Sequence, residues 1–211
     1  MGTPANKKPR QQPLRDRQKQ LTRDLIMRAV ADIVTERGVH SFTVQEVADR
    51  AGVSHRSVYR HFPTREALLE ELYEWGDQLM DVPGALGVPS SLDDLPGMAE
   101  RLFALFDSSP HPVKAMAVAM LTMDMSPRTR VERDAVYTEL LSQAASNLGF
   151  EARQRAFAVL KYLFSPQAWL FLRERHSLTG EEAGRAIAWA LSTLIDGLKQ
   201  GNAAAGPGGR R

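Results

Sequence analysis

Apolar residues recur along most of this 211-residue chain at intervals of three and four positions, and strict alternation of apolar and polar residues is scarce. The first spacing aligns side chains on one face of an α-helix, whereas alternation is typical of a β-strand. The pattern therefore predicts an all-α protein.

The spacing predicts a first helix over about residues 16–37, ended by Gly38, with an apolar stripe formed by Leu21, Leu25, Ile26, Ala29, Val30, Ile33 and Val34. Prolines and glycines predict a loop over residues 81–91 and a break over 108–112. The remaining helices are expected at about 43–51, 54–62, 65–80, 92–107, 113–123, 126–148, 151–176 with an interruption at Ser165-Pro166, and 179–200.

Residues 43–62 predict two short helices joined by a tight turn. Thr43 and Glu46 have capping-box spacing, Gly52 stands where a left-handed residue ends a helix, and Ser54 is a suitable N-cap for the second helix. Val58 and Phe62 lie one turn apart and should face inward. The polar residues of the second helix then face outward, which is typical of a helix presented to DNA.

Charge is distributed unevenly along the chain. Residues 1–65 hold 13 Lys/Arg and 6 Asp/Glu, a balance of +7, and residues 66–211 hold the other 14 and 19, a balance of −5. This asymmetry favours a polyanion-binding module at the N-terminus. Residues 1–17 lack apolar periodicity and are expected to form a disordered basic arm.

The stretch from Leu21 to Leu69 resembles the N-terminal domain of TetR-family transcriptional regulators. The resemblance is carried by Gly38, Phe42-Thr43-Val44, Val47-Ala48, Ala51-Gly52-Val53-Ser54, Val58-Tyr59-Arg60-His61-Phe62 and Arg65-Glu66-Ala67-Leu68-Leu69. It implies a three-helix helix-turn-helix domain followed by a C-terminal helical domain for ligand binding and dimerisation. The boundaries expected are a basic arm at 1–17, the DNA-binding domain at 18–66, the effector and dimerisation domain at 67–200 and a disordered tail at 201–211.

Arg56 is the first candidate for base reading, since it stands in the first turn of the second short helix and arginine pairs bidentately with guanine. A phosphate contact is the alternative. The resemblance implies phosphate contacts for Tyr59 and His61. It also marks Arg56 as a departure, because many relatives carry a small residue there, and the operator therefore cannot be taken from them. The full set of DNA-binding candidates is Thr43, Ser54, His55, Arg56, Ser57, Tyr59, Arg60, His61 and Arg65.

Methionine and aromatic residues in the C-terminal region suit a cavity that admits varied apolar ligands, although many of them are expected to be plain core. The candidates are Met98, Phe103, Phe106, Met116, Met120, Met123, Tyr137, Phe157, Tyr162 and Trp169.

The last two helices carry more apolar residues than one face needs, which favours burial against a second copy of the chain; an ordinary core helix is the alternative. The candidate dimer interface comprises Leu170, Ile187, Leu191, Leu194, Ile195 and Leu198.

The chain has no cysteine, no His-Glu zinc motif, no glycine-rich phosphate loop and no nucleophile elbow. We therefore expect no enzymatic activity, cofactor or metal. With no apolar run for a membrane span and no signal peptide, a cytoplasmic location is expected.

The sequence thus predicts a homodimeric regulator, a repressor released from a palindromic operator by a small hydrophobic effector. Two alternatives stay open: a DNA-binding dimer without an effector, and a helical ligand-binding or enzymatic protein whose basic domain is incidental.

Overall fold

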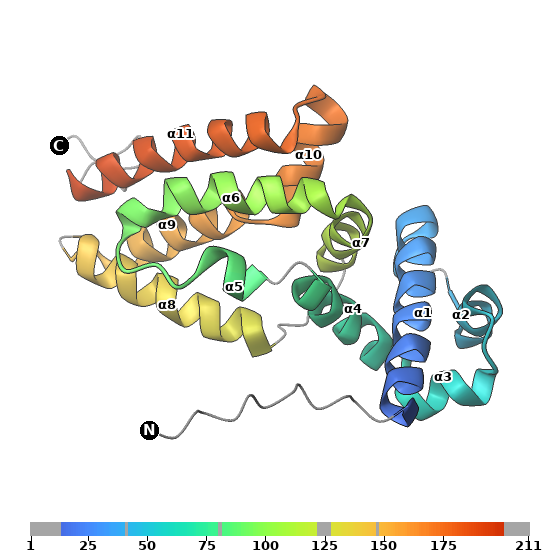
Figure 1. The fold of residues 1–211 in the computed structure, drawn as a ribbon. Helices are drawn as coiled ribbons and strands as arrows, with labels where there is room; N and C mark the ends of the chain where they lie inside the picture. The colour runs from blue at the N-terminus through green and yellow to red at the C-terminus, as the bar shows by residue number, and fades with distance from the viewer. Residues whose placement is uncertain (1–13, 41, 80–81, 122–127, 147, 201–211) are drawn as a thin grey trace, which may run out of the picture.

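The computed structural model describes residues 14–40, 42–79, 82–121, 128–146 and 148–200, and within those ranges the chain forms helices and no β-strand (Figure 1). This confirms the all-α prediction. The elements in chain order are α1 (Leu14–Arg37), α2 (Val44–Ala51), α3 (His55–His61), α4 (Arg65–Leu79), α5 (Val82–Leu86), the 3₁₀ helix η1 (Leu92–Asp94), α6 (Leu95–Ser108), α7 (Pro110–Met120), α8 (Arg128–Ala144), α9 (Phe150–Leu163), α10 (Pro166–His176) and α11 (Gly180–Lys199).

Helices α1 to α4 share an N-terminal core. Its fully buried side chains include Ile26, Val30 and Ile33 of α1, Val47 of α2, Val58 of α3, and Leu68 and Leu72 of α4. Burying such side chains contributes about 1.5–3 kcal/mol each, which is how two helices of 8 and 7 residues, too short to be stable alone, are held in place.

The stripe predicted on α1 is correct from Ile26 onward and wrong at two positions. Leu21 is 63% exposed and Leu25 is 49% exposed, whereas Met27 and Ala31, outside the predicted stripe, are fully buried. Helix α1 packs against α2, α4 and α7. Because these three helices pack on several sides of α1, they bury more than one stripe of it. The spacing of apolar residues does not tell how far along α1 these contacts extend.

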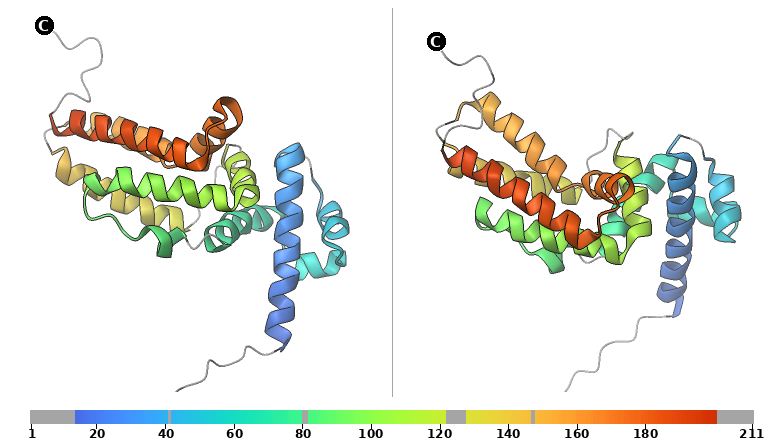
Figure 2. Two further views of the ribbon diagram at one scale, coloured as in Figure 1. Left: turned by 45° about the horizontal axis from the view of Figure 1, so that its top comes forward. Right: turned by 90° about the horizontal axis from the view of Figure 1, so that it is seen from above.

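The C-terminal helices pack around α6, whose main neighbour is α11 (Figure 2). Two glycines of α11 allow this close approach. An added Cβ at Gly180 would lie 2.5 Å from the backbone oxygen of Phe103, and one at Gly184 would lie 2.9 Å from Cα of Glu100. Asp107 of α6 fixes the same end, because its carboxylate accepts hydrogen bonds from the Gly180 amide at 2.8 Å, the Trp169 indole at 3.1 Å and the Arg173 guanidinium at 3.1 Å.

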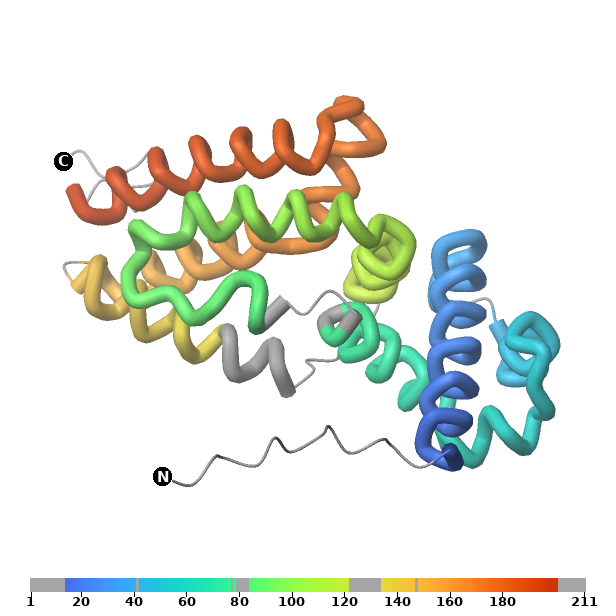
Figure 3. The backbone as a smooth tube through the Cα atoms, viewed as in Figure 1, coloured from blue at the N-terminus to red at the C-terminus, as the bar shows by residue number. Residues whose placement is uncertain are grey.

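Helix α7 stands between the two halves of the molecule and contacts α1 and α4 on one side and α6 and α10 on the other (Figure 3). Ala115 and Ala119 belong to the N-terminal core, whereas Val113 and Met116 belong to the C-terminal core. The N-terminal core also takes in α4 as far as Trp75. The boundary after residue 66 therefore stays a prediction, since packing continues across it.

Several predicted element boundaries need correction. The loop expected over 81–91 contains α5, and the expected disordered arm overlaps α1, which already begins at Leu14. The break at 108–112 is shorter than expected: Pro110 and Pro112 lie in the first turn of α7, where the missing amide hydrogens cost nothing. The interruption at Ser165-Pro166 is confirmed, with Ser165 capping α10. The predicted start at Ser126-Pro127 and the tail at 201–211 lie outside the described residues.

Gly180→Ala should lower the free energy of unfolding by roughly 1–3 kcal/mol, the usual cost of forcing an extra methyl into a filled core. The reason is that the new Cβ would lie 2.5 Å from the Phe103 oxygen and 2.7 Å from Cβ of Asp107. Urea denaturation at fixed protein concentration measures the change.

Gly97→Ala is the matched control, since its added Cβ would come no closer than 3.7 Å to the flexible end of Arg101. Relief of glycine's entropic cost should leave it as stable as the original or more stable by about 0.5–1 kcal/mol. Equal stability of the two variants would contradict the close packing of α11 on α6.

Candidate nucleic-acid interface and ligand cavity

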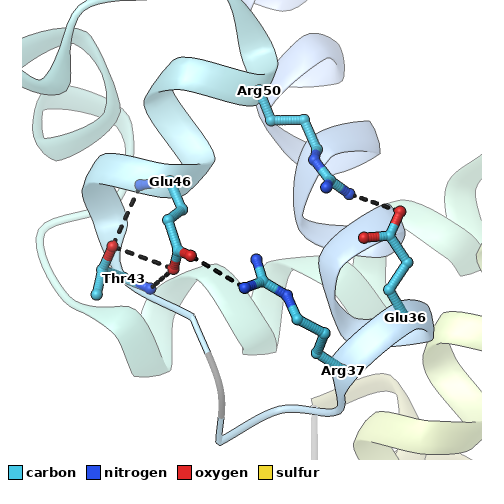
Figure 4. A network of polar contacts seen from close by, with 5 residues as sticks. All are labelled: Glu36, Arg37, Thr43, Glu46 and Arg50. Carbon is cyan, nitrogen blue, oxygen red and sulfur yellow. Dashed lines mark hydrogen bonds and ion pairs between the residues drawn. The ribbon is translucent and has the colours of Figure 1, made fainter.

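The helix-turn-helix is held rigidly at the start of α2 (Figure 4). Glu46 accepts a hydrogen bond from the Thr43 amide at 2.8 Å, and the Thr43 hydroxyl accepts one from the Glu46 amide at 3.2 Å, which completes the predicted capping box. Glu46 also pairs with Arg37 of α1 at 3.1 Å, and Arg50 pairs with Glu36 at 2.8 Å. The hydrogen bond from the Thr43 amide, and then the Arg37 guanidinium, hold the pKa of Glu46 below its usual range.

The turn and α3 form as predicted. Gly52 has the left-handed backbone that a tight turn needs, with φ 65°, and its amide bonds back to α2. The Ser54 side chain caps α3 by accepting a hydrogen bond from the Ser57 amide at 3.1 Å. The two serine hydroxyls also lie 2.9 Å apart, within hydrogen-bond distance. Both residues therefore have a structural role that explains them without DNA.

Helix α3 presents a polar outer face while Val58 and Phe62 are buried beneath it. Arg56 is exposed and makes no hydrogen bond or ion pair with any residue in the described ranges. The rings of His55 and Tyr59 pack edge-on with centroids 4.6 Å apart, which orders two outward side chains of the same helix.

A cluster of positive charge adjoins the end of α3. Burial, and then the charges of Arg60, Lys19 and Arg23, hold the pKa of His61 below its usual value. Lys19 and Arg23 come from α1, and Arg23 also forms an ion pair with Glu71 of α4. The sequence analysis did not single out Arg23, and periodicity gives no signal for it, because its closeness to His61 arises from the packing of α1 on α3 and α4.

Arg65 begins α4 and is half buried. Its guanidinium lies over the Phe42 ring, 4.7 Å from the centroid, and Nη2 is buried without a hydrogen-bond partner. A guanidinium nitrogen without a partner is costly in the protein interior and is suited to an added anion. Together with the cluster around His61, these groups could bind phosphates on either side of an α3 placed in a groove.

A cavity of about 420 Å³ lies between α6, α7, α8, α9 and α10. Of the predicted pocket residues, five line it: Phe106, Met116, Met120, Tyr137 and Tyr162. Four do not, and that part of the prediction is wrong for this cavity: Met98, Phe103 and Trp169 are buried in the core, and Phe157 packs against it. Met123 lies outside the described residues.

The sequence analysis missed the polar part of this cavity. Asp134 of α8 and Lys161 of α9 line it and form an ion pair with each other. Gln167, in the first turn of α10, also lines it, and its Oε1 is buried without a hydrogen-bond partner. No sequence signal marks these residues, since α8, α9 and α10 must pack together before they meet.

The predicted dimer interface needs correction. Ile187, Leu191, Ile195 and Leu198 are 0–7% exposed and lie in the protomer's own core, so they have no surface to offer a second copy. The glycines of α11 let α6 cover this face. Leu170 and Leu194 are partly buried against the same core. The large apolar residue that α11 leaves outside is Trp189, 74% exposed.

In the part of the chain that the structure describes, no three His, Asp or Glu side chains gather as a metal site requires. None of its helices is long and apolar enough to cross a membrane.

Comparison with known proteins agrees with this geometry. The sequence model of the family described as "Bacterial regulatory proteins, tetR family" matches residues 26–72. The HTH-type transcriptional repressor KstR2 of Mycolicibacterium smegmatis is 36% identical over 50 residues, 24% of each chain. An uncharacterized HTH-type transcriptional regulator of Mycobacterium tuberculosis is 33% identical over 82 residues, 39% of this chain and 41% of that protein. The matches thus span well under half the length of these relatives.

Solved structures match over far more of the chain. NalD, the secondary repressor of the MexAB-OprM multidrug efflux pump in Pseudomonas aeruginosa, superposes with a TM-score of 0.58 at 18% identity, covering 84% of this chain and 96% of its own. FadR from Bacillus subtilis, solved in complex with stearoyl-CoA, gives 0.56 at 13% identity, covering 84% and 98%. At these identities the likeness is one of fold. The N-terminal helices thus match the TetR family in sequence, and the chain as a whole resembles these regulators in fold.

Proposed function

We propose that this protein is a cytoplasmic transcriptional repressor that binds a palindromic operator as a homodimer and releases it when a small, mostly apolar molecule enters the cavity. The observation that carries the DNA-binding part is α3 itself. It is capped and fixed on a buried core, it offers Arg56 outward in its first turn, and the positive charges of Arg60, Lys19 and Arg23 lie around His61 at its end.

The remaining DNA-binding candidates fit the same proposal in different roles. Thr43 and Ser54 cap the helices and lie at their N-termini, where phosphate is favoured. His55, Ser57 and Tyr59 supply the rest of the α3 surface, and His61 and Arg65 stand at its far end.

We place the dimer contact on the outer face of α11 around Trp189. Ala186 and Thr193 stand one turn from it, Gly197 stands two turns from it and Ala190 follows it, so several small residues lie near the bulky ring. Such a face permits a second helix to approach closely, and a buried tryptophan is a frequent centre of binding energy. Two copies related by a two-fold axis would present two α3 helices to a palindrome.

The cavity supports the effector part. Met116 and Met120 line it from α7, and the next residues around that helix, Ala115 and Ala119, pack into the N-terminal core. A ligand that shifts α7 would therefore bias the position of the DNA-binding helices. FadR from Bacillus subtilis, a neighbour in fold, was solved in complex with stearoyl-CoA, a ligand with a long apolar acyl chain.

The two alternative functions are distinguished by simple observations. An effector-independent DNA-binding dimer predicts that no ligand enters the cavity and alters operator affinity. A ligand-binding or enzymatic protein with an incidental basic domain predicts no salt-dependent binding to a specific duplex.

Arg56→Ala should weaken operator binding by roughly 1–3 kcal/mol and relax sequence preference at one position, because a bidentate contact to a base would be lost. Binding of the unaltered protein should fall steeply with salt, as counterion release requires. Selection from a random duplex library, followed by titration of the selected site, measures both. Arg101→Ala, which removes an exposed arginine from α6, is the control and should change neither. Unchanged affinity and preference in Arg56→Ala would exclude base reading by this residue.

Operator binding should strengthen as the pH falls from about 8 to about 6, through the ordinary range of histidine. In the free protein the lowered pKa of His61 means that the folded domain favours the neutral ring. A bound phosphate favours the charged ring, raises that pKa, and so couples proton uptake to DNA binding.

His61→Gln should flatten this pH profile, whereas His176→Gln, at the exposed end of α10, should retain it. Titrations by fluorescence anisotropy at constant ionic strength, with the fold checked by circular dichroism at each pH, make the comparison. A profile that is identical in both variants would mean that His61 lies away from the phosphates.

Trp189→Glu should convert a dimer at micromolar concentration into monomers and weaken operator binding, because a charge would be buried without a partner at the interface. Phe150→Glu is the matched control, since Phe150 of α9 is 70% exposed, close to the 74% of Trp189. Sedimentation equilibrium measures both. A wild-type monomer, or a dimer that survives Trp189→Glu, would overturn this interface.

A further inference from the structure

The wall of the cavity is apolar over most of its extent and polar at a few points. Leu102 and Phe106 of α6 and Met116 and Met120 of α7 supply apolar surface. The cavity reaches the solvent, because Leu121 and Tyr162 line it and are both more than half exposed. A ligand therefore has a way in, and most of its own surface must be apolar.

The two charged groups of the wall neutralise each other. Asp134 and Lys161 are paired, and each side chain is only 26–29% exposed. Lys161 Nζ also lies 5.5 Å from the centre of the Phe157 ring. An anionic ligand would have to draw Lys161 away from Asp134, which would leave that carboxylate covered and without its partner. The pair thus disfavours a carboxylate or phosphate headgroup.

Among the polar groups of the wall, the side-chain oxygen of Gln167 lacks a hydrogen-bond partner in the described part of the chain. Its neighbour Ser165 already accepts one hydrogen bond, from the Ala168 amide at 3.2 Å. Gln167 Oε1 has no hydrogen-bond partner within the described ranges and no access to solvent. A carbonyl oxygen only accepts, so a ligand satisfies it by donating an O–H or N–H. A carboxylate has no donor and would repel it.

We propose that the cavity takes a neutral, mostly apolar molecule with one hydroxyl or amide N–H, toward which the Gln167 side chain turns so that Oε1 accepts its hydrogen bond. This ligand class rests on the proposed function only in assigning the effector to this cavity. Sites that hydrogen-bond a ligand group discriminate strongly against analogues that lack it, because the buried partner is then left unpaired.

Three probes of similar length test the class: n-decanol, its isomer nonyl methyl ether, and decanoate. Each is titrated calorimetrically into the full-length protein below its solubility limit. The alcohol should bind about tenfold more tightly than the ether, which corresponds to one well-made hydrogen bond. Decanoate should bind most weakly of the three.

Gln167→Met keeps the length of the side chain and removes the acceptor. It should abolish the preference for the alcohol and leave ether binding unchanged or tighter. Gln154→Met, on the exposed surface of α9, is the matched control and should retain the preference. Asp134→Asn is an independent variant: it releases Lys161 from its partner, and decanoate should then bind several-fold more tightly.

Operator binding is measured in the same preparations, so that failures are told apart. Equal binding of alcohol and ether, or a preference that survives Gln167→Met, overturns the ligand class and leaves the repressor proposal intact. Failure of all three probes to bind, with operator binding normal, overturns the ligand class together with the effector part of the proposed function. If the unaltered protein shows no specific operator binding while the probes bind as expected, only the proposed function is overturned.

Discussion

Helix α7 contributes side chains to both cores, and the arrangement of the two halves depends on how closely it approaches α1 and α4. The face turned to them carries Ala115 and Ala119 in place of larger residues. Helix α4 also comes close to the cavity wall: an added Cβ at its Gly76 would lie 2.2 Å from Sδ of Met116, a residue that lines the cavity. Small residues thus bring the cavity wall close to the helices that carry α3. Because packed interfaces are not continuously deformable, a shift of α7 must be accompanied by a shift of α4 or α1.

A polar contact reinforces this junction at its edge. Nε2 of His111 in α7 lies 2.7 Å from Asp32 of α1, with both side chains about half exposed at 46% and 43%. Exposed polar contacts of this kind contribute little to stability, so the alanine packing and not this contact holds the halves together. The same reasoning separates two features of the first turns of α11: Gly180 and Gly184 set the close approach to α6, while the exposed pair between Arg185 and Glu181 contributes little to the fold.

Local chemistry is where the sequence was most informative. The capping box of Thr43 with Glu46 forms as its spacing predicts, because a cap involves only residues within one turn, and Thr179 with Glu182 forms a second one of the same spacing. The outward face of α3 follows from Val58 and Phe62 for the same reason. The sequence did not predict which distant element each apolar helix face contacts. The apolar surplus of α11 was assigned to a second copy, yet Gly180 and Gly184 admit α6 and bury Leu191 within the protomer. A helix with several apolar faces does not reveal which neighbour covers each.

The cavity illustrates the same limit in its chemistry. Methionines and aromatic residues predicted an apolar wall, and Phe106, Met116 and Met120 are there. Trp169 is of the same residue type but lies in the core, where its indole donates to Asp107. What gives the cavity selectivity is the state of its polar groups, and that is decided by pairing. Lys161 and Gln167 are both polar residues on helices, but Lys161 has a partner and Gln167 Oε1 has none within the described residues. Composition carries no information about that difference, because it arises only when α8, α9 and α10 meet.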